Sequence, residues 1–295
     1  MPLPIRLILS GGLGNQLFQI SAGIFIKEQL KFDVNYDASN LLGRIKSDPG
    51  NYTRHLEISE LLEDPNLVTK KPHWFVDQLL TRYKRAFRKP FYVFENSPFD
   101  RPLQMVNQNT RGVYGFFQDA NIVNLTWDSL LLRMKKSEKF SPLVSAGKLD
   151  RIAIHIRFGD YSDDPGTKRI YGLTKQSYYF AALENLAKQN ASVDSLVIVT
   201  DNAAKAETYL SGINFPGQIQ YISNSTAIED LMEIARSAYV ITSNSTFSWW
   251  GGWVAHRLHG SHIIYPRPWL ADKTNPDLPI YVDEWQAIER DFDTQ

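Results

Sequence analysis

The sequence predicts an α/β fold with parallel sheets, organised as two domains. The chain has 295 residues, of which 43% are hydrophobic, so it can bury a substantial core. Strand patterns alternate with helical patterns through the second half, and the first half opens with a strand, a glycine turn and a helix. Strands that alternate with helices indicate a parallel sheet covered by helices on both faces.

The expected elements follow in order along the chain. Each strand is a short run of apolar residues, and each helix carries apolar residues three or four positions apart. In the first half we expect a strand at 5–9 and a helix at about 15–30, with a less regular continuation. In the second half we expect strands at 152–157, 196–200, 218–222, 239–242 and 262–265. Helices are expected between them at 175–188, 203–210, 228–236 and 247–259.

The domain boundary is expected near residue 150, where a small-residue turn precedes a new strand. This places a first domain at 1–150 and a second domain at 151–266. The remaining segment, 267–295, is expected to cross back to the first domain.

Composition excludes several classes of protein. The chain has no cysteine, which excludes disulfides, thiolate catalysis and zinc–cysteine sites. The formal net charge is zero, so extensive nucleic-acid binding has no electrostatic support. No apolar run reaches transmembrane length, and the first residues lack a signal-peptide pattern, which together favour a cytoplasmic protein. Histidines and carboxylates show no ligand spacing, so no metal is expected.

A basic segment at 82–89 is flanked by aromatic residues. Such a segment can lie on anionic lipid headgroups, which would place the protein peripherally at the inner membrane face. The alternative is a solvated helix face, which is the more common use of such charges.

The most informative stretch is SNSTFSWWGGW, residues 243–253. Small hydroxyl residues stand where a strand gives way to a helix, and free N–H groups at a helix start bind anions such as phosphate. Three tryptophans follow and are candidates to line a cavity. The alternative is an ordinary Ser/Thr cap followed by a buried aromatic helix. The candidate phosphate-binding residues are Ser243, Ser245, Thr246 and Phe247.

A second motif, HIRFGDY at 155–161, lies at the end of a buried strand. Alternation along the strand puts His155 and Arg157 on the same face. An arginine that leaves a buried strand suits a phosphate, because its planar fork donates two parallel hydrogen bonds. The alternative is an internal ion pair between Arg157 and Asp160.

Two further carboxylates fall near strand ends. Asp201 follows the strand at 196–200, and Asp230 opens the helix before the hydroxyl-rich stretch. Carboxylates at these positions can bind a ribose diol or the N–H edge of guanine. The alternative for both is helix capping.

The first strand runs into a glycine turn, GGLGNQ at 11–16, which suits close approach of a phosphate or sugar. Gly12 and Gly14 are the candidate contacts. The pattern lacks the third glycine of a dinucleotide site and the Lys-Ser/Thr of a P-loop, and such turns are often only structural.

Together the motifs GGLGNQLFQ, GFFQ, HIRFGDY and SNSTFSWWGGW, in this order, resemble the α-1,2-fucosyltransferases, which are inverting enzymes that use GDP-fucose. The resemblance covers nearly the whole chain. It implies a GT-B fold, in which two Rossmann-like domains face each other across a cleft, with 1–150 on the acceptor side and 151–266 binding the nucleotide sugar. It also implies that no metal and no cofactor is needed, since GDP-fucose is a co-substrate.

The resemblance assigns roles to the candidate residues. Arg157 would bind the β-phosphate of GDP-fucose, and His155 would line the same wall. Ser245, Thr246 and Phe247 would form the phosphate cup, while Asp201 and Asp230 would face ribose or guanine. Asn15 would reach across the cleft to the pyrophosphate or fucose. Asp160 is the candidate general base by proximity, or it braces the loop.

One position departs from the family pattern, which has two adjacent arginines where this chain has Arg157 and Phe158. Strand alternation keeps the direction of Arg157 and predicts that Phe158 packs beneath the loop. A second positive charge for the diphosphate would then come from elsewhere.

We interpret the chain as an inverting fucosyltransferase that moves L-fucose from GDP-β-L-fucose to the 2-hydroxyl of galactose in an oligosaccharide or lipid-linked glycan. One alternative is a GDP-sugar transferase of another sugar or linkage. The other is a non-catalytic glycan-binding protein that uses the surface of Trp249, Trp250 and Trp253.

Overall fold

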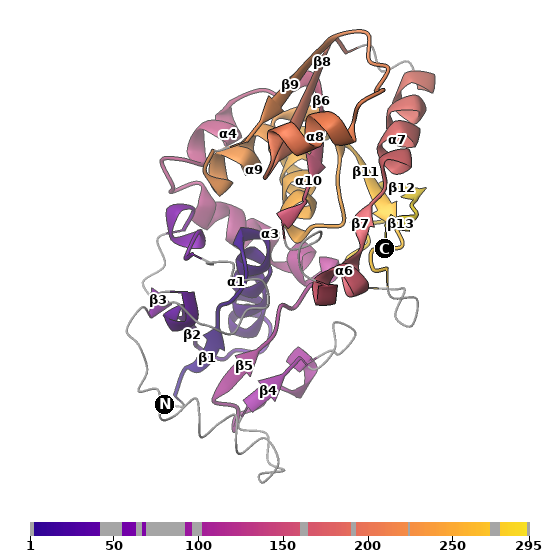
Figure 1. Ribbon diagram of the computed structural model, residues 1–295. Coiled ribbons are helices and arrows are strands. Elements are labelled where there is room, and N and C mark those ends of the chain that lie inside the picture. The colour runs from indigo at the N-terminus through magenta and orange to yellow at the C-terminus, as the bar shows by residue number, and fades with distance from the viewer. Residues whose placement is uncertain are drawn as a thin grey trace. The chain divides into compact units, whose positions relative to one another are not determined.

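The computed structural model describes residues 3–41, 55–62, 67–68, 92–95, 102–159, 165–189, 193–223, 225–271 and 278–293. The chain separates into two compact units (Figure 1). The first unit comprises residues 1–47 and 53–136, and the second comprises residues 48–52 and 137–295. The packing therefore divides the chain at Lys136, ahead of the boundary near residue 150 that the sequence predicts.

The first unit is built on a parallel five-stranded sheet of order β3-β2-β1-β5-β4. Its strands are β1 Ile5–Ile8, β2 Val34–Asp37, β3 Leu67–Val68, β4 Tyr92–Phe94 and β5 Gly112–Tyr114. Its helices are α1 Leu13–Glu28 and α3 Ala120–Met134, with short 3₁₀ turns at Ser39–Leu41, Ile58–Glu60 and Pro102–Met105. The two helices pack on each other, and α1 packs closely on β2 at Gly23, where an added Cβ would lie 2.3 Å from the Tyr36 ring.

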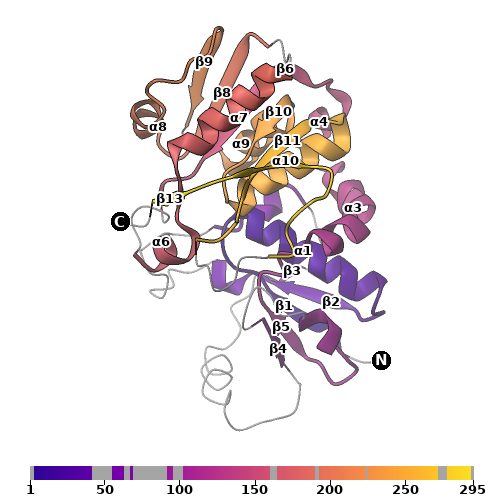
Figure 2. The ribbon, with the colours of Figure 1, turned by 90° about the vertical axis from the view of Figure 1, so that its right-hand side faces the viewer.

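The second unit holds a parallel six-stranded sheet of order β12-β11-β10-β6-β8-β9 (Figures 1 and 2). Its strands are β6 Leu149–Ile156, β8 Ser195–Thr200, β9 Gln218–Ile222, β10 Ser237–Ile241, β11 His262–Arg267 and β12 Gln286–Glu289. Its helices are α4 Ser141–Ser145, α6 Pro165–Tyr171, α7 Gln176–Lys188, α8 Ala203–Tyr209, α9 Ala227–Ala235 and α10 Thr246–His259. Two short strands, β7 Leu173–Thr174 and β13 Phe292–Asp293, pair antiparallel.

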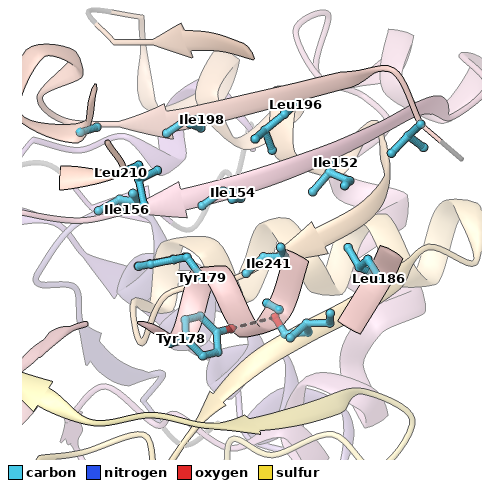
Figure 3. Close-up of a cluster of buried hydrophobic side chains, with 14 of the residues drawn as sticks. Ile152, Ile154, Ile156, Tyr178, Tyr179, Leu186, Leu196, Ile198, Leu210 and Ile241 are labelled. Atoms are coloured by element: carbon cyan, nitrogen blue, oxygen red, sulfur yellow. Dashed lines mark hydrogen bonds between the residues drawn. The ribbon is translucent and has the colours of Figure 1, made fainter. Parts of the chain in front are cut away.

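The two faces of this second sheet carry different side chains. Ile152, Ile154 and Ile156 of β6 join a buried cluster with residues of α7 and α8, which Figure 3 shows around Tyr178 and Tyr179. Because successive strand residues point to opposite faces, His155 lies on the other face, where it meets residues at the start of α10. The alternation on β6 thus places the three isoleucines in this cluster and His155 on the side of the sheet where α10 starts.

The alternating strands and helices of the second half are as the sequence predicts, so the α/β class is confirmed. The described part of the segment after residue 266 adds β12 to the second sheet, beside β11. Among the described residues, no helix is long and apolar enough to cross a membrane.

Candidate functional site

The predicted site residues of the second unit gather where β6, β8 and β10 end. These three strands are neighbours in the sheet, so residues that follow them meet at one edge. Arg157 follows β6, Asp201 follows β8, and Ser243 lies between β10 and α10. In open parallel sheets, ligands bind at this edge.

His155 is a buried, neutral histidine beside the start of α10. The residue is 4% exposed, and its Nδ1 lies 3.0 Å from the Ser243 hydroxyl oxygen. The Phe247 ring lies 5.2 Å from its centroid. Burial, and to a smaller extent the positive charge of Arg157, lowers the pKa of His155 to about 3. A histidine with so low a pKa is a poor general base.

The low pKa of His155 predicts a pH-dependent stability. The unfolded chain binds a proton at this histidine below about pH 6.5, while the folded protein does not until about pH 3. The unfolding free energy is therefore unaffected by this histidine at pH 7 and decreases as the pH falls below 6.5. From pH 7 to pH 5, His155 alone should cost about 2 kcal/mol of unfolding free energy. Glutamine does not titrate, so the unfolding free energy of His155→Gln, measured by urea denaturation, should fall less between pH 7 and pH 5 than that of the wild type. An equal fall in both proteins would contradict the burial of a neutral ring.

Arg157 pairs with Asp201 and remains partly accessible. Its Nε lies 3.5 Å from Asp201 Oδ2, and the two side chains are 28% and 26% exposed. The other carboxylate oxygen, Oδ1, accepts the Phe158 backbone N–H at 3.0 Å. Asp201 therefore fixes the strand end that carries Arg157. It does not cap α8, because the carboxamide oxygen of Asn202 accepts the N–H of Lys205 and fills that role.

The start of α10 combines an ordinary cap with hydroxyls that bind within the protein. Ser245 is the N-cap, and its hydroxyl oxygen accepts the Phe247 N–H at 3.3 Å. The buried Ser243 and Ser248 hydroxyls lie 3.3 Å apart. Thr246 is the first helical residue and is partly exposed. The remaining donors for an anion at this helix start are backbone N–H groups, whose charge the helix dipole supports.

The tryptophans of this stretch belong to the core. Trp249, Trp250 and Trp253 are 1%, 0% and 3% exposed. The rings of Trp249 and Trp253 are stacked, with centroids 5.2 Å apart and planes 9° from parallel. The prediction of a tryptophan-lined surface is therefore wrong, because these rings are used to pack α10.

Asp230 lies in the first turn of α9 and does not cap it. Thr226 and Glu229 form a reciprocal capping box instead. Burial raises the pKa of Asp230 to about 6, and the Ser225 hydrogen bond opposes this rise. Its Oδ1 is buried and accepts no hydrogen bond from the described part of the chain.

In the first unit, the glycine turn is held by side chains of the same unit. Gly11 has φ +76°, and the N–H of Leu13 donates to Glu57 Oε2 at 2.5 Å. A carboxylate thus already occupies the start of α1. Gly12 is the N-cap position of this helix and Gly14 is buried. Asn15 is partly exposed, and its carboxamide oxygen accepts from Gln118 at 3.1 Å.

Two glutamines of the same motif are structural. Gln16 and Gln19 are both fully buried. Gln16 donates to the carbonyls of Gly11 and His55, and Gln19 donates to the carbonyl of Gly115. These hydrogen bonds join the turn to the segments that contain His55 and Gly115, so both glutamines serve the fold of the first unit.

A buried network behind the α10 start was not predicted from the sequence. Asn244 is 2% exposed, and its amide donates to the carbonyls of Tyr171 and Trp269 at 2.8 and 3.3 Å. Arg290, 5% exposed, donates to the same two carbonyls at 3.0 and 2.6 Å. The Thr174 hydroxyl bonds both residues, at 3.0 Å to Asn244 and 2.6 Å to Arg290. This network, residues 171, 174, 244, 269 and 290, fixes the chain just before Ser245.

Some predictions fall on parts of the chain outside the described residues. These are the candidate base Asp160 and the basic segment at 82–89. Within the described residues, no group of three or more His, Asp or Glu side chains is placed to hold a metal ion.

Comparison with known families decides the class of this protein. The sequence model of glycosyl transferase family 11 matches residues 76–289. The chain belongs to this family. It is therefore a glycosyltransferase, in agreement with the resemblance seen in its motifs.

Two relatives from Escherichia coli match along almost their whole length. One is the O-antigen biosynthesis glycosyltransferase WbnK, 26% identical over 94% of this chain and 98% of the relative. The other is an alpha-1,2-colitosyltransferase, 25% identical over 96% of this chain and 98% of the relative.

Among solved structures, a mutant of Arabidopsis thaliana FUT1 in complex with GDP is similar with a TM-score of 0.51 and 11% identity. The match covers 90% of this chain and 71% of that one. This likeness shows the fold, and the expected GT-B class with two Rossmann-like units is confirmed.

Proposed function

We propose that this glycosyltransferase is an inverting α-1,2-fucosyltransferase that transfers L-fucose from GDP-β-L-fucose to the 2-hydroxyl of a galactose in a glycan. The observation that carries the proposal is the strand edge of the second unit, where Arg157, Asp201 and the start of α10 lie together. This edge offers a cation and helix N–H groups to a diphosphate, with carboxylates nearby for a nucleoside.

Each part of the GDP-sugar would have its own contacts in this site. Arg157 would contact the β-phosphate, and Ser245, Thr246 and Phe247 would form the phosphate cup, with the N–H groups of Ser245 and Thr246 as its donors because the Phe247 N–H is bound by the cap. His155 would orient this wall through its contact with Ser243. Asp201 and Asp230 would accept hydrogen bonds from ribose or guanine. In the first unit, Gly12, Gly14 and Asn15 remain candidate contacts to the donor.

The reaction would be a single displacement at the anomeric carbon. The acceptor oxygen forms a bond to that carbon as the bond to the β-phosphate oxygen breaks, and the departing GDP gains negative charge. Arg157 and the helix N–H groups act where this charge develops. The acceptor hydroxyl loses its proton to a base, for which Asp160 remains the candidate because His155 is too weakly basic.

A second donor has specific support. One relative is an alpha-1,2-colitosyltransferase, and colitose is fucose without its 3-hydroxyl. The two GDP-sugars would present the same nucleotide and diphosphate to the strand edge, so the described contacts favour neither sugar. A glycan-binding role without catalysis has lost its basis, because the tryptophans it requires are buried.

The deciding experiment incubates the protein with GDP-fucose or GDP-colitose and a panel of galactosides, in excess EDTA. We expect an α-1,2-linked fucoside, identified by NMR of the product, with EDTA leaving the rate unchanged because cationic and N–H groups of the protein neutralise the diphosphate. Arg157→Ala provides the inactive control.

Three outcomes would change the conclusion. Transfer from GDP-colitose alone would establish the second donor. A different linkage would retain the donor site and revise the acceptor. Complete loss of turnover in EDTA, restored by magnesium or manganese, would contradict the metal-independent assignment.

A further inference from the structure

The diphosphate of a GDP-sugar carries more than one negative charge, and Arg157 supplies one positive charge that it shares with Asp201. The next residue along the chain is Phe158, which is 2% exposed and belongs to the core of the second unit. Phe158 therefore packs inward, as the sequence predicts, and brings no charge of its own. The source of a second positive charge has to be sought among neighbouring elements.

Lys205 lies directly beside Phe158. Its ammonium nitrogen is 4.8 Å from the centroid of the Phe158 ring, within the distance at which a cation is attracted to an aromatic face. The ring is held edge-on by Tyr209 of α8, with centroids 5.5 Å apart and planes at 88°. Phe158 is thus a rigid seat for the lysine head group.

The backbone around Lys205 directs the side chain toward the strand edge. Lys205 is the third residue of α8, and its N–H donates to the capping oxygen of Asn202 at 3.0 Å. Helical side chains point toward the N-terminus of their helix, and α8 begins where β8 ends. Asp201, which bonds Arg157 and the Phe158 N–H, occupies the same strand end. The lysine head group therefore lies over the Phe158 ring, one residue along the chain from Arg157, at the strand end that Asp201 also occupies.

We propose that Lys205, seated on the Phe158 ring, supplies a second positive charge to the diphosphate of the GDP-sugar. An ammonium suits this role because it acts as a point charge and needs no fixed fork geometry. The aromatic seat restricts a side chain that would otherwise lose much rotamer freedom on binding. This inference rests on the proposed function, since it requires a nucleoside diphosphate at this strand edge.

The test measures GDP and GMP affinity by calorimetry for the wild type, Lys205→Met and Lys205→Arg. Methionine keeps the length of the side chain and removes its charge. We expect Lys205→Met to lose about tenfold or more in GDP affinity and less than about threefold in GMP affinity, because GMP lacks the β-phosphate. Lys205→Arg should stay close to wild type. The salt dependence of GDP binding should weaken in Lys205→Met, because one screened charge is gone.

Phe158→Leu tests the seat itself. We expect Lys205→Met to cost less GDP affinity in a Phe158→Leu background than in the wild type, because the lysine is then no longer held over a ring. Thermal unfolding of each variant checks that the core persists. Lys188→Met is the matched control, since this exposed lysine of α7 pairs with Glu184 and should not affect GDP binding.

Two results would overturn the proposal. One is a Lys205→Met protein with GDP affinity within twofold of the wild type. The other is an equal loss for GDP and GMP, which would indicate a general disturbance of α8. A wild-type protein that binds no GDP at all would instead remove the proposed function, and this inference with it.

Discussion

Replacing Arg157 by alanine is expected to lower kcat by about a hundredfold or more while the protein stays folded. The guanidinium is partly accessible at the strand edge, so it is available to a ligand. Its contact with a phosphate oxygen should strengthen as the sugar leaves, and a contact of that kind affects kcat more than binding. The pair with Asp201 is more than a quarter exposed on the arginine side, so its loss should cost about 1 kcal/mol of stability or less.

Lysine at this position should not rescue turnover. It keeps the positive charge but loses the two parallel donors that match a phosphate. The pKa of His155 offers a second readout, because the charge of Arg157 contributes to its lowering. NMR titration should show a higher His155 pKa in Arg157→Ala and a smaller change in Arg157→Lys.

Arg236→Ala is the matched control for this experiment. Arg236 follows α9, has a side chain 34% exposed and pairs with Glu233 at 3.8 Å, so its setting is comparable but lies at the opposite end of β10. Its turnover should stay near that of the wild type. A folded Arg157→Ala enzyme within about threefold of wild-type kcat/KM would exclude Arg157 from the site, because that ratio corresponds to less than 1 kcal/mol.

The parts of this site that the sequence predicts are those that depend on local periodicity. Alternation along β6 places His155 and Arg157 on one face and Phe158 on the other, and the structure shows Phe158 in the core. The strand ends converge because parallel strands share an edge, so the sequence alone assigns Asp201 and Ser243 to that edge. The roles of these residues in binding remain predictions.

The contacts that the sequence does not predict join distant segments through backbone groups. Thr174 bonds Asn244 and Arg290, which lie 70 and 116 positions further along the chain. The acceptors that Asn244 and Arg290 share are backbone carbonyls, which every residue carries. Likewise, the glycine turn looked open to a phosphate, but the first N–H of α1 is taken by Glu57. A side-chain pattern cannot reveal which backbone group it will meet.

Replacing Arg290 by methionine is expected to lower the unfolding free energy by about 3 kcal/mol and to reduce turnover as well. The guanidinium is buried and donates to the carbonyls of Tyr171, Pro268 and Trp269 and to the Thr174 hydroxyl. Methionine fills much of the volume but leaves these buried acceptors without their donor, and that loss dominates the cost.

The effect on turnover follows from the acceptors that Arg290 shares with Asn244. Both side chains donate to the carbonyls of Tyr171 and Trp269, and Asn244 directly precedes the cap of α10. Loss of one donor should loosen the segment that carries the helix N–H groups of the proposed diphosphate site. Asn244→Ala should therefore act in the same direction, and the double variant should lose less than the sum of the two, because the residues act through one network.

Urea denaturation and steady-state kinetics below the unfolding transition measure the two effects separately. Arg267→Met is the control, since this neighbouring arginine of β11 is exposed and lies over the Tyr281 ring, 4.8 Å from its centroid. It should change stability by no more than about 1 kcal/mol. If Arg290→Met were as stable as that control, the network would not hold the α10 start. If it lost stability but kept full turnover, the network would support the fold without positioning the phosphate cup.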